Sequence, residues 1–268
     1  MKETIETEAQ ILFHFIMAFA CLMYHSLSDG RFPDGQYPKY TTTRDLFAEH
    51  LRLLMFRGFR LGTFDDVLRR LQSTKPISEQ HCFLSFDDGH KSSLELAELM
   101  VQAGVRGTFF LTMNYCRERE DFLKPDEIRR LANDAFDFGT HGVTHRALSR
   151  MPRDEMRAEL RDSKAWLEDI LGKPVRSVSL PAGQGNRAVI ETAKELGYQL
   201  IGNSVEKMNS PEKIPAEINR FVILNSYSGE LVCRIARGST VYQATRRIRA
   251  ALLALPKRLL RSYDATRR

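Results

Sequence analysis

The stretch Phe83-Leu84-Ser85-Phe86-Asp87-Asp88-Gly89 decides how the rest of the chain can be arranged. It begins with an apolar run typical of a buried strand and ends in two adjacent carboxylates and a glycine. Two like charges at the end of a buried strand repel each other and are costly to desolvate. The pair therefore needs a cation, a proton or open water. In a regular strand the two carboxylates would point to opposite faces, but Gly89 allows the backbone to turn both into one pocket.

A second polar segment, His141-Gly142-Val143-Thr144-His145, places two imidazoles four residues apart. This spacing occurs by chance on helices, but Gly139 and Gly142 favour a loop. One carboxylate and two histidines leave open positions on a divalent ion, which is typical of hydrolytic metal sites. If the segments meet, we expect one aspartate to bind the ion and its neighbour to take a proton from the attacking water. The alternative is an exposed Asp-Asp-Gly turn, which the preceding apolar run disfavours.

Strand-like and helix-like segments alternate along the chain. Strands are expected at 21–25, 82–86, 107–111, 136–141, 175–180, 198–202 and 220–224, with amphipathic helices between them. The alternation indicates parallel βαβ units and an α/β fold, and about seven such units fit a closed or nearly closed (β/α) barrel. The aspartate pair, His141 and Pro181 all fall at the carboxyl ends of strands. Barrel enzymes keep their reactive groups at that face.

The positive charge of the chain is concentrated at its carboxyl end. The formal net charge of the 268 residues is +6, but residues 231–268 hold ten Arg and Lys against one Asp. Apolar residues recur at helical spacing from Thr240 to Tyr263, so we expect a basic amphipathic helix, packed on the barrel or lying on an anionic membrane. The positive charge lies on one apolar-striped tail with few aromatic residues, which argues against a nucleic-acid partner. We expect three parts, an N-terminal extension (1–21), a barrel domain (22–230) and a basic helical tail (231–268).

Cysteine usage and the N-terminal residues bear on the compartment. Cys21 and Cys82 lie in apolar runs and no cysteines form a CxxC pair, which suits a reducing environment. The apolar run from Ile11 to Tyr24 is short for a membrane span, and the ten residues before it hold one Lys against three Glu, unlike a secretory signal. We therefore expect a cytoplasmic protein, with peripheral contact at the inner face of the membrane through the tail.

Three segments resemble motifs of the polysaccharide deacetylases, the NodB-homology group of carbohydrate esterase family four. Ser85-Phe86-Asp87-Asp88-Gly89 is similar to the (T/S)FDDG motif, and the segment from Gly139 to Leu148 is similar to H(S/T)xxH with its following leucine. Leu180-Pro181-Ala182-Gly183, followed by Asn186 and Gly197-Tyr198, is similar to the PxG segment and the helix after it. The resemblance spans roughly residues 22–224. It implies a distorted barrel and metal-dependent removal of N- or O-acetyl groups from sugars.

Carried over by position, the resemblance gives each motif a role. Asp87 would be the general base, and the metal ligands would be Asp88, His141 and His145. The backbone N–H of Ala182, after Pro181, would help to hold the oxyanion. Members of the family vary in their divalent metal. Zinc is the first expectation, with cobalt, nickel and manganese as alternatives.

The chain departs from the family pattern at several positions. Gly142 stands where Ser or Thr is usual, so a hydrogen bond that braces the loop is either missing or supplied by Thr144. No arginine matches the third motif, since Arg176 is close but not aligned. Ala182 replaces an aromatic residue, which implies a roomier pocket wall. The late Leu-x-His motif, which carries the general acid, has no counterpart because no histidine follows His145.

His25 is the candidate for the missing acid. It ends a Tyr-His strand and resembles a subset of these deacetylases in which the late motif is moved to the N-terminus. A strand-end histidine would reach the same barrel face and could protonate the leaving amine. The alternative for His25 is a core histidine bonded to the backbone, and His90 is a second candidate for the acid.

These features predict a cytoplasmic deacetylase that acts on an N-acetylated sugar carried on a lipid or a nucleotide. A hydrolase of a non-sugar amide on the same barrel is one alternative. Another is a degenerate domain that binds glycan or membrane without turnover. It is suggested by the third motif, which lacks its arginine, and by the missing late histidine. Asp87 argues against the degenerate domain, because a binding module has no need of a base.

Overall fold

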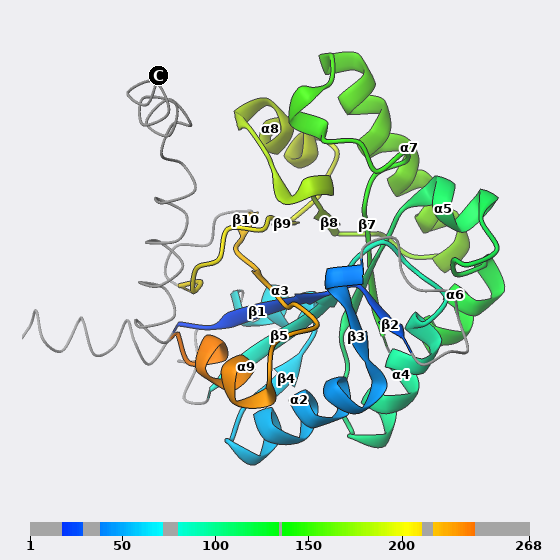
Figure 1. The fold of residues 1–268 in the computed structure, drawn as a ribbon. Coiled ribbons are helices and arrows are strands. Elements are labelled where there is room, and N and C mark those ends of the chain that lie inside the picture. Colours follow the sequence, from blue (N-terminus) through cyan, green and yellow to red (C-terminus); the bar gives the residue numbers. More distant parts are fainter. Residues whose placement is uncertain (1–17, 29–37, 72–79, 134–135, 211–216, 239–268) are drawn as a thin grey trace, which may run out of the picture.

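The computed structural model describes residues 18–28, 38–71, 80–133, 136–210 and 217–238. In this part of the chain, nine strands form one parallel sheet that curls strongly into a half-barrel, and the longer helices cover its outer side (Figure 1). A separate two-stranded sheet lies beside the carboxyl end of the first strand. The α/β barrel predicted from the alternating pattern, and the distortion that the family resemblance implied, are confirmed.

The bounds of the elements follow the predicted segments closely. The strands of the main sheet are β1 (Ala20–Tyr24), β4 (Arg60–Gly62), β5 (His81–Phe86), β6 (Thr108–Leu111), β7 (Asp137–Thr140), β8 (Ser177–Ser179), β9 (Leu200–Gly202), β10 (Glu217–Ile218) and β11 (Phe221–Val222). The small sheet contains β2 (Ser26–Ser28) and β3 (Thr41–Thr43). The helices are α2 (Arg44–Phe56), α3 (Phe64–Leu71), α4 (Ser93–Gln102), α5 (Met113–Glu118), α6 (Pro125–Asn133), α7 (Arg153–Leu171), α8 (Arg187–Glu195) and α9 (Gly229–Ala236). Each of the seven predicted strands has a counterpart, whereas β4 and β10 are too short to give a periodic signal.

The central strand is β5, which carries the aspartate pair at its end. It pairs in parallel with β1 on one edge, and on the other edge with β4 along its first half and β6 along its second. Every residue of β5 is buried. Burial on both faces is typical of parallel sheets covered by helices, and it explains the continuous apolar run before Asp87.

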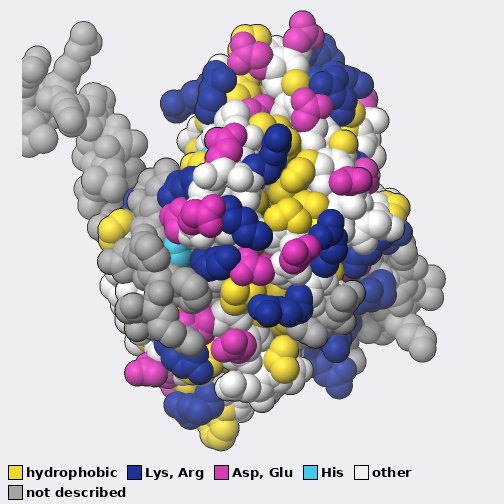
Figure 2. All heavy atoms as spheres, turned by 90° about the vertical axis from the view of Figure 1, so that its right-hand side faces the viewer, with side chains coloured by type: hydrophobic (Ala, Val, Ile, Leu, Met, Phe, Trp, Pro, Cys, Tyr) yellow, Lys and Arg dark blue, Asp and Glu magenta, His cyan; other side chains and the backbone are white. Residues whose placement is uncertain are grey.

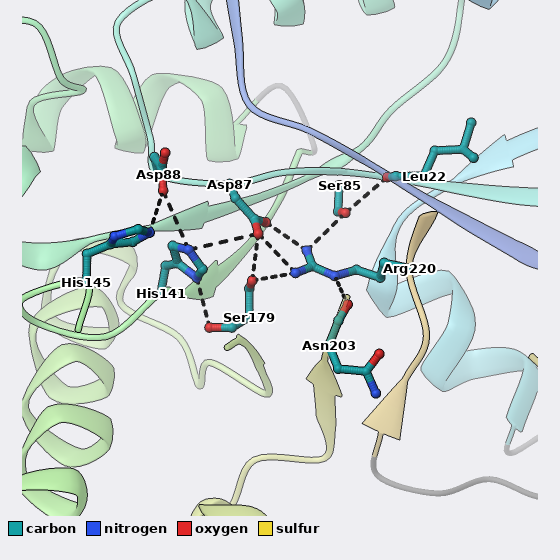
Figure 3. Close-up of polar contacts among 9 residues, drawn as sticks. All are labelled: Leu22, Ser85, Asp87, Asp88, His141, His145, Ser179, Asn203 and Arg220. Atoms are coloured by element: carbon teal, nitrogen blue, oxygen red, sulfur yellow. Dashed lines mark hydrogen bonds and ion pairs between the residues drawn. The ribbon is translucent and has the colours of Figure 1, made fainter. Parts of the chain in front are cut away.

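A short piece of chain joins the two ends of the sheet. β10 pairs with β9 at one end and β11 pairs with β1 at the other, and only Asn219 and Arg220 separate β10 from β11. The chain therefore crosses from one end of the curled sheet to the other at this point. Arg220 is fully buried there, with its side chain directed at residues from β5 and β8 (Figure 3).

The last described helix belongs to the barrel. α9 packs against α2 and β1, and its Val232 and Ile235 are fully buried in the main core. The predicted boundary at residue 230 falls inside α9, and the predicted N-terminal extension ends inside β1. The division into three parts stays a prediction, and the basic helix expected from 240 to 263 lies outside the described residues.

The surface of the described residues mixes both signs of charge. Figure 2 shows the right-hand face of Figure 1, on which basic and acidic side chains are interspersed. Many such side chains form exposed pairs, including Arg157 with Glu195 at 2.6 Å and Arg129 with Asp126 at 2.7 Å. None of the described helices is long and apolar enough to cross a membrane. The cysteines are buried free thiols, as predicted for Cys21 and Cys82.

Candidate metal centre

Three strands of one half of the sheet, β5, β7 and β8, bring the site residues together, with β6 between β5 and β7. Asp87 and Asp88 follow β5, His141 follows β7, and Ser179 ends β8. Because the strands are parallel, their carboxyl ends open at the same face of the curled sheet, and the loop after β7 carries His145 to that face as well (Figure 3). The meeting of the aspartate pair with the two histidines, which the sequence left conditional, is confirmed.

One carboxylate and two imidazoles converge on a single point. Asp88 Oδ1 lies 3.1 Å from His145 Nε2 and 3.5 Å from His141 Nε2, and one ligand atom from each residue lies within 4.8 Å of the others. Within the described part of the chain, Asp88 Oδ1 is buried and accepts no hydrogen bond of good geometry. Leaving a buried carboxylate oxygen unsatisfied is costly, and a divalent ion between the three residues would satisfy it. The donor set fits a metal ion such as zinc.

The backbone is strained at this site. Among the described residues, the non-glycine residues with positive φ are Asp88 at 78°, His145 at 62° and Ala182 at 59°. Such conformations are disfavoured for residues with a Cβ and cluster at functional sites. The turn at Asp88 continues through Gly89, where φ is 83° and a Cβ would lie 2.8 Å from Leu111 Cδ2. This turn directs both carboxylates towards His141 Nε2, which lies 3.9 Å from Asp87 Oδ2 and 3.5 Å from Asp88 Oδ1.

His141 is held in the form that binds metal ions. Its Nδ1 lies 2.9 Å from the carbonyl oxygen of Ser179, which can only accept, so Nδ1 carries the proton and Nε2 presents a lone pair. Burial lowers the pKa of His141 to about 4, despite the opposing charges of Asp87 and Asp88. The ring is therefore neutral at physiological pH and needs to lose no proton to bind an ion.

His145 has the opposite character. Burial alone would lower its pKa, but the close approach of the Asp88 carboxylate outweighs burial and raises the pKa above its ordinary value. A proton and a metal ion compete for the same Nε2 lone pair. Metal binding at this site is therefore expected to release a proton and to weaken as the pH falls.

Arg220, which the sequence pattern did not identify as a site residue, holds the second carboxylate. Its Nη1 donates to Asp87 Oδ1 at 2.7 Å and its Nη2 donates to Asp87 Oδ2 at 2.9 Å, a bidentate pair with both side chains buried (Figure 3). Ser179 Oγ donates a third hydrogen bond to Oδ2 at 2.8 Å. Asp87 is thus fixed with one oxygen 3.9 Å from His141 Nε2.

The remaining donors of Arg220 are also satisfied. Nε donates to the carbonyl oxygen of Asn203 at 2.9 Å, Nη1 also donates to Ser85 Oγ at 3.2 Å, and Nη2 also donates to Ser179 Oγ at 2.7 Å. Ser85 Oγ in turn donates to the carbonyl oxygen of Leu22. A guanidinium group has five N–H donors, so each has a partner inside the barrel.

This network sets the charge of Asp87. Burial raises the pKa of its carboxyl group, but the charge of Arg220, supported by His141 and the Arg220 hydrogen bonds, outweighs burial and holds the pKa well below its ordinary value. Asp87 is therefore ionised at neutral pH, beside the point where an ion would bind. An ionised carboxylate in this place can accept a proton.

The sequence does carry one signal for Arg220. It stands directly before the apolar run from Phe221 to Leu224, at the start of the predicted strand 220–224. The site therefore contains an arginine although the third motif lacks one, and Arg176, the near match in that motif, is exposed.

His25 lies directly after β1, near both carboxylates. Burial raises the pKa of Asp87 and of Asp88, and the charge of His25 is one of the opposing effects that bring both below their ordinary values. Its ring stacks on Tyr40 with centroids 4.7 Å apart, and its buried Nδ1 has no hydrogen-bond partner in the described residues. His90, the second candidate acid, is buried with its Nδ1 hydrogen bonded to Ser92 Oγ at 2.9 Å.

The Pro181 turn lies against the metal-binding loop. Pro181 begins a 3-10 turn that follows β8, and its Cγ would lie 3.5 Å from a Cβ placed on Gly142. Ala182 is exposed in this turn and has a positive φ. The use of the Ala182 N–H as an oxyanion donor stays a prediction.

A curled α/β barrel with an Asp-His-His cluster beside an ionised aspartate, all at the carboxyl ends of the strands, is typical of metal-dependent hydrolases. The family model for polysaccharide deacetylases matches residues 74–201. On this match, and on the similarity to curated relatives, the chain belongs to the polysaccharide deacetylase family.

Curated proteins agree with that assignment, and a solved structure shares the fold. YxkH of Bacillus subtilis, a provisionally named polysaccharide deacetylase, is 24% identical over 200 residues, which cover 74% of this chain and 69% of YxkH. A peptidoglycan-N-acetylglucosamine deacetylase of Bacillus cereus is 26% identical over 161 residues, 59% of this chain and 73% of that protein. The structure of the Streptococcus pyogenes deacetylase PplD in complex with acetate has a TM-score of 0.74 at 20% identity, covering 82% of this chain and 98% of that one. The structural likeness establishes the fold.

Proposed function

We propose that this protein removes acetyl groups from an N-acetylated sugar in a polysaccharide or glycoconjugate, by metal-dependent hydrolysis of the amide bond. The observation that carries the proposal is the ionised Asp87, fixed by Arg220 beside the cluster of Asp88, His141 and His145. Family membership supports an acetylated polysaccharide such as peptidoglycan as the class of substrate.

Each residue of the site would have a distinct task. Asp88, His141 and His145 would hold a divalent ion, which when bound supplies Lewis acidity for a coordinated water and for the acetyl carbonyl. Asp87 would accept the proton that the attacking water loses. Because its pKa is low, Asp87 is a weak base and depends on a nearby cation to make that water acidic.

His25 would complete the proton transfer by protonating the leaving amine. Its place at the end of β1, near both carboxylates, supports this role, and the Tyr40 stack would fix the plane of its ring. The N–H of Ala182 would donate to the oxygen of the tetrahedral intermediate. Zinc as the metal, a lipid- or nucleotide-linked acceptor, a cytoplasmic location and membrane contact through the tail stay predictions.

The buried Arg220 bears on the alternatives. A domain that only bound glycan would gain nothing from burying an arginine to keep one carboxylate ionised beside a metal cluster, and burial of such a pair is costly. This favours an enzyme over a degenerate binding domain. A non-sugar amide substrate is left as the competing activity, and a substrate panel separates the two.

The test is acetate release by the full chain, measured on N-acetylglucosamine oligomers, on peptidoglycan and on N-acetylated amino acids. We expect release from the sugars, loss of that release after chelation, and recovery when zinc or cobalt is returned. Release only from the acetylated amino acids would favour the competing activity. Release that survives chelation, or no release from any acetylated sugar, would contradict the proposal.

A further inference from the structure

The loop that carries His145 is fastened to a single buried carboxylate on helix α7. Glu159 is 6% exposed, and its Oε2 accepts hydrogen bonds from the backbone N–H groups of Val143 at 2.6 Å and Thr144 at 3.0 Å. Its Oε1 accepts a hydrogen bond from Thr144 Oγ1 at 2.5 Å. Three donors of the four-residue segment after His141 therefore end on one side chain.

The same carboxylate explains why residue 142 is a glycine. A Cβ at this position would lie 3.0 Å from Glu159 Oε2, and φ of Gly142 is +77°, a conformation that disfavours other residues. The Ser or Thr usual in this motif would therefore meet both the Glu159 carboxylate and an unfavourable backbone. Of the two expectations for bracing the loop, Thr144 supplies the hydrogen bond, and Glu159 is the acceptor.

The fastened segment leads directly into the strained ligand. His145 has a φ of 62° and follows Thr144, which Glu159 holds at both its N–H and its hydroxyl group. A strained backbone persists only where surrounding contacts determine it. Without these contacts, the loop could relax and turn the His145 ring away from Asp88.

We propose that Glu159 is a positioning residue for the metal site, which acts through the loop by holding His145 in its ligating position. The proposal rests on the proposed function only in taking Asp88, His141 and His145 as a metal site. Groups that orient metal ligands are commonly as necessary as the ligands, and changing one typically lowers metal affinity by about 10–100-fold.

Charge and geometry must be separated, because the negative charge of Glu159 also acts on His145 against the effect of burial. Glu159→Gln removes the charge but keeps an oxygen for the two backbone N–H groups and an amide that can donate to the Thr144 hydroxyl. Glu159→Asp keeps the charge but withdraws the carboxylate by one methylene from all three donors. A matched control is Glu155→Ala, one turn earlier on α7, where a half-exposed carboxylate pairs with Arg146 at 3.3 Å.

The experiment titrates zinc into the full-length variants against a chromophoric chelator, with thermal unfolding of the metal-free proteins measured in parallel. We expect Glu159→Asp and Glu159→Ala to bind zinc about 10–100-fold more weakly than the wild type. We expect Glu159→Gln to stay within about threefold of the wild type and Glu155→Ala to be unchanged. Cobalt-substituted Glu159→Asp should also show an altered visible absorption, since the ligand geometry changes.

The pattern across the variants decides the matter. Wild-type zinc affinity in Glu159→Asp would overturn the proposal. Weak zinc binding in Glu159→Gln together with normal binding in Glu159→Asp would overturn it too, because that result would mean that only the charge of Glu159 matters. Lower thermal stability with unchanged zinc affinity would show a purely structural role and would overturn it too. If Glu159→Ala does not fold, the Gln and Asp variants still decide. Absence of zinc binding by the wild type would instead count against the proposed function.

Discussion

Replacing Arg220 with methionine is expected to lower the free energy of unfolding by about 3–5 kcal/mol, because the Asp87 carboxylate is then buried inside the barrel without a cation beside it. The wild-type pair is bidentate, with N–O distances of 2.7 and 2.9 Å, and both side chains are buried. Methionine fills a similar volume without replacing any of the hydrogen bonds. Urea denaturation of the metal-free variants measures the change.

The pH dependence of that loss has a definite sign. In the wild type the pKa of Asp87 is depressed, so the stability that the pair contributes is present above about pH 4, the value of an unfolded aspartate, and is lost only as the pH falls through the lower folded value. In Arg220→Met, burial still raises the pKa of Asp87, but the charge of Arg220 no longer lowers it. Asp87 therefore takes up a proton at a higher pH in the variant than in the wild type. The difference in unfolding free energy between the two proteins should therefore shrink between about pH 7 and about pH 4.

The control for this prediction removes both charges. Arg220→Met combined with Asp87→Asn removes both charges of the buried pair, so the double variant should recover much of the stability that Arg220→Met loses. Arg220→Lys keeps a charge but cannot form the bidentate pair, so it should fall between the two. A loss of less than about 1 kcal/mol in Arg220→Met, or no recovery in the double variant, would contradict the role assigned to this pair.

Changing each of the two adjacent aspartates to asparagine should affect zinc affinity and turnover differently. Asp88→Asn removes a charged metal ligand, so zinc affinity should fall by more than the roughly 10–100-fold typical of residues that only orient ligands. Asp87→Asn removes the base while leaving the three ligands in place. Its zinc affinity should stay close to the wild type, and its turnover should fall by about 10²–10⁴-fold.

This prediction is checked by zinc titration and acetate release on the same preparations. Asp87→Asn also leaves the Arg220 charge unpaired, so thermal unfolding must confirm that each variant is folded at the assay temperature. The division of roles would be wrong if both variants lost zinc equally. It would also be wrong if Asp87→Asn turned over at the wild-type rate.

Local signals predicted the seven strands along the chain, their parallel arrangement and one side of the site. The apolar run of β5 followed by Asp87, Asp88 and Gly89 is contiguous in the sequence, so the burial of the strand and the turn could both be read from it. His141 and His145 were found for the same reason, since their loop contains its own glycine. The resemblance to a family then assigned expected roles to these residues.

The residues that support the site could not be found in this way. Arg220 lies 133 residues from Asp87 in the sequence, and only the curling of the sheet brings them together. Glu159 is one of several acidic residues on α7, and nothing in the helix pattern distinguishes it from Glu155. β4 and β10 contain three and two residues, too few for alternation to show. In each case tertiary packing decides, and the local sequence does not specify the partner.

The central claim is that Asp88, His141 and His145 together bind a divalent ion beside Asp87. The most direct measurement is X-ray diffraction from zinc-soaked crystals of the full chain, with anomalous data collected at the zinc absorption edge. We expect one strong peak at about 2.0–2.2 Å from an Asp88 carboxylate oxygen and from the Nε2 atoms of both histidines. No peak at these three residues, or a peak coordinated by other residues while they stay empty, would contradict the account.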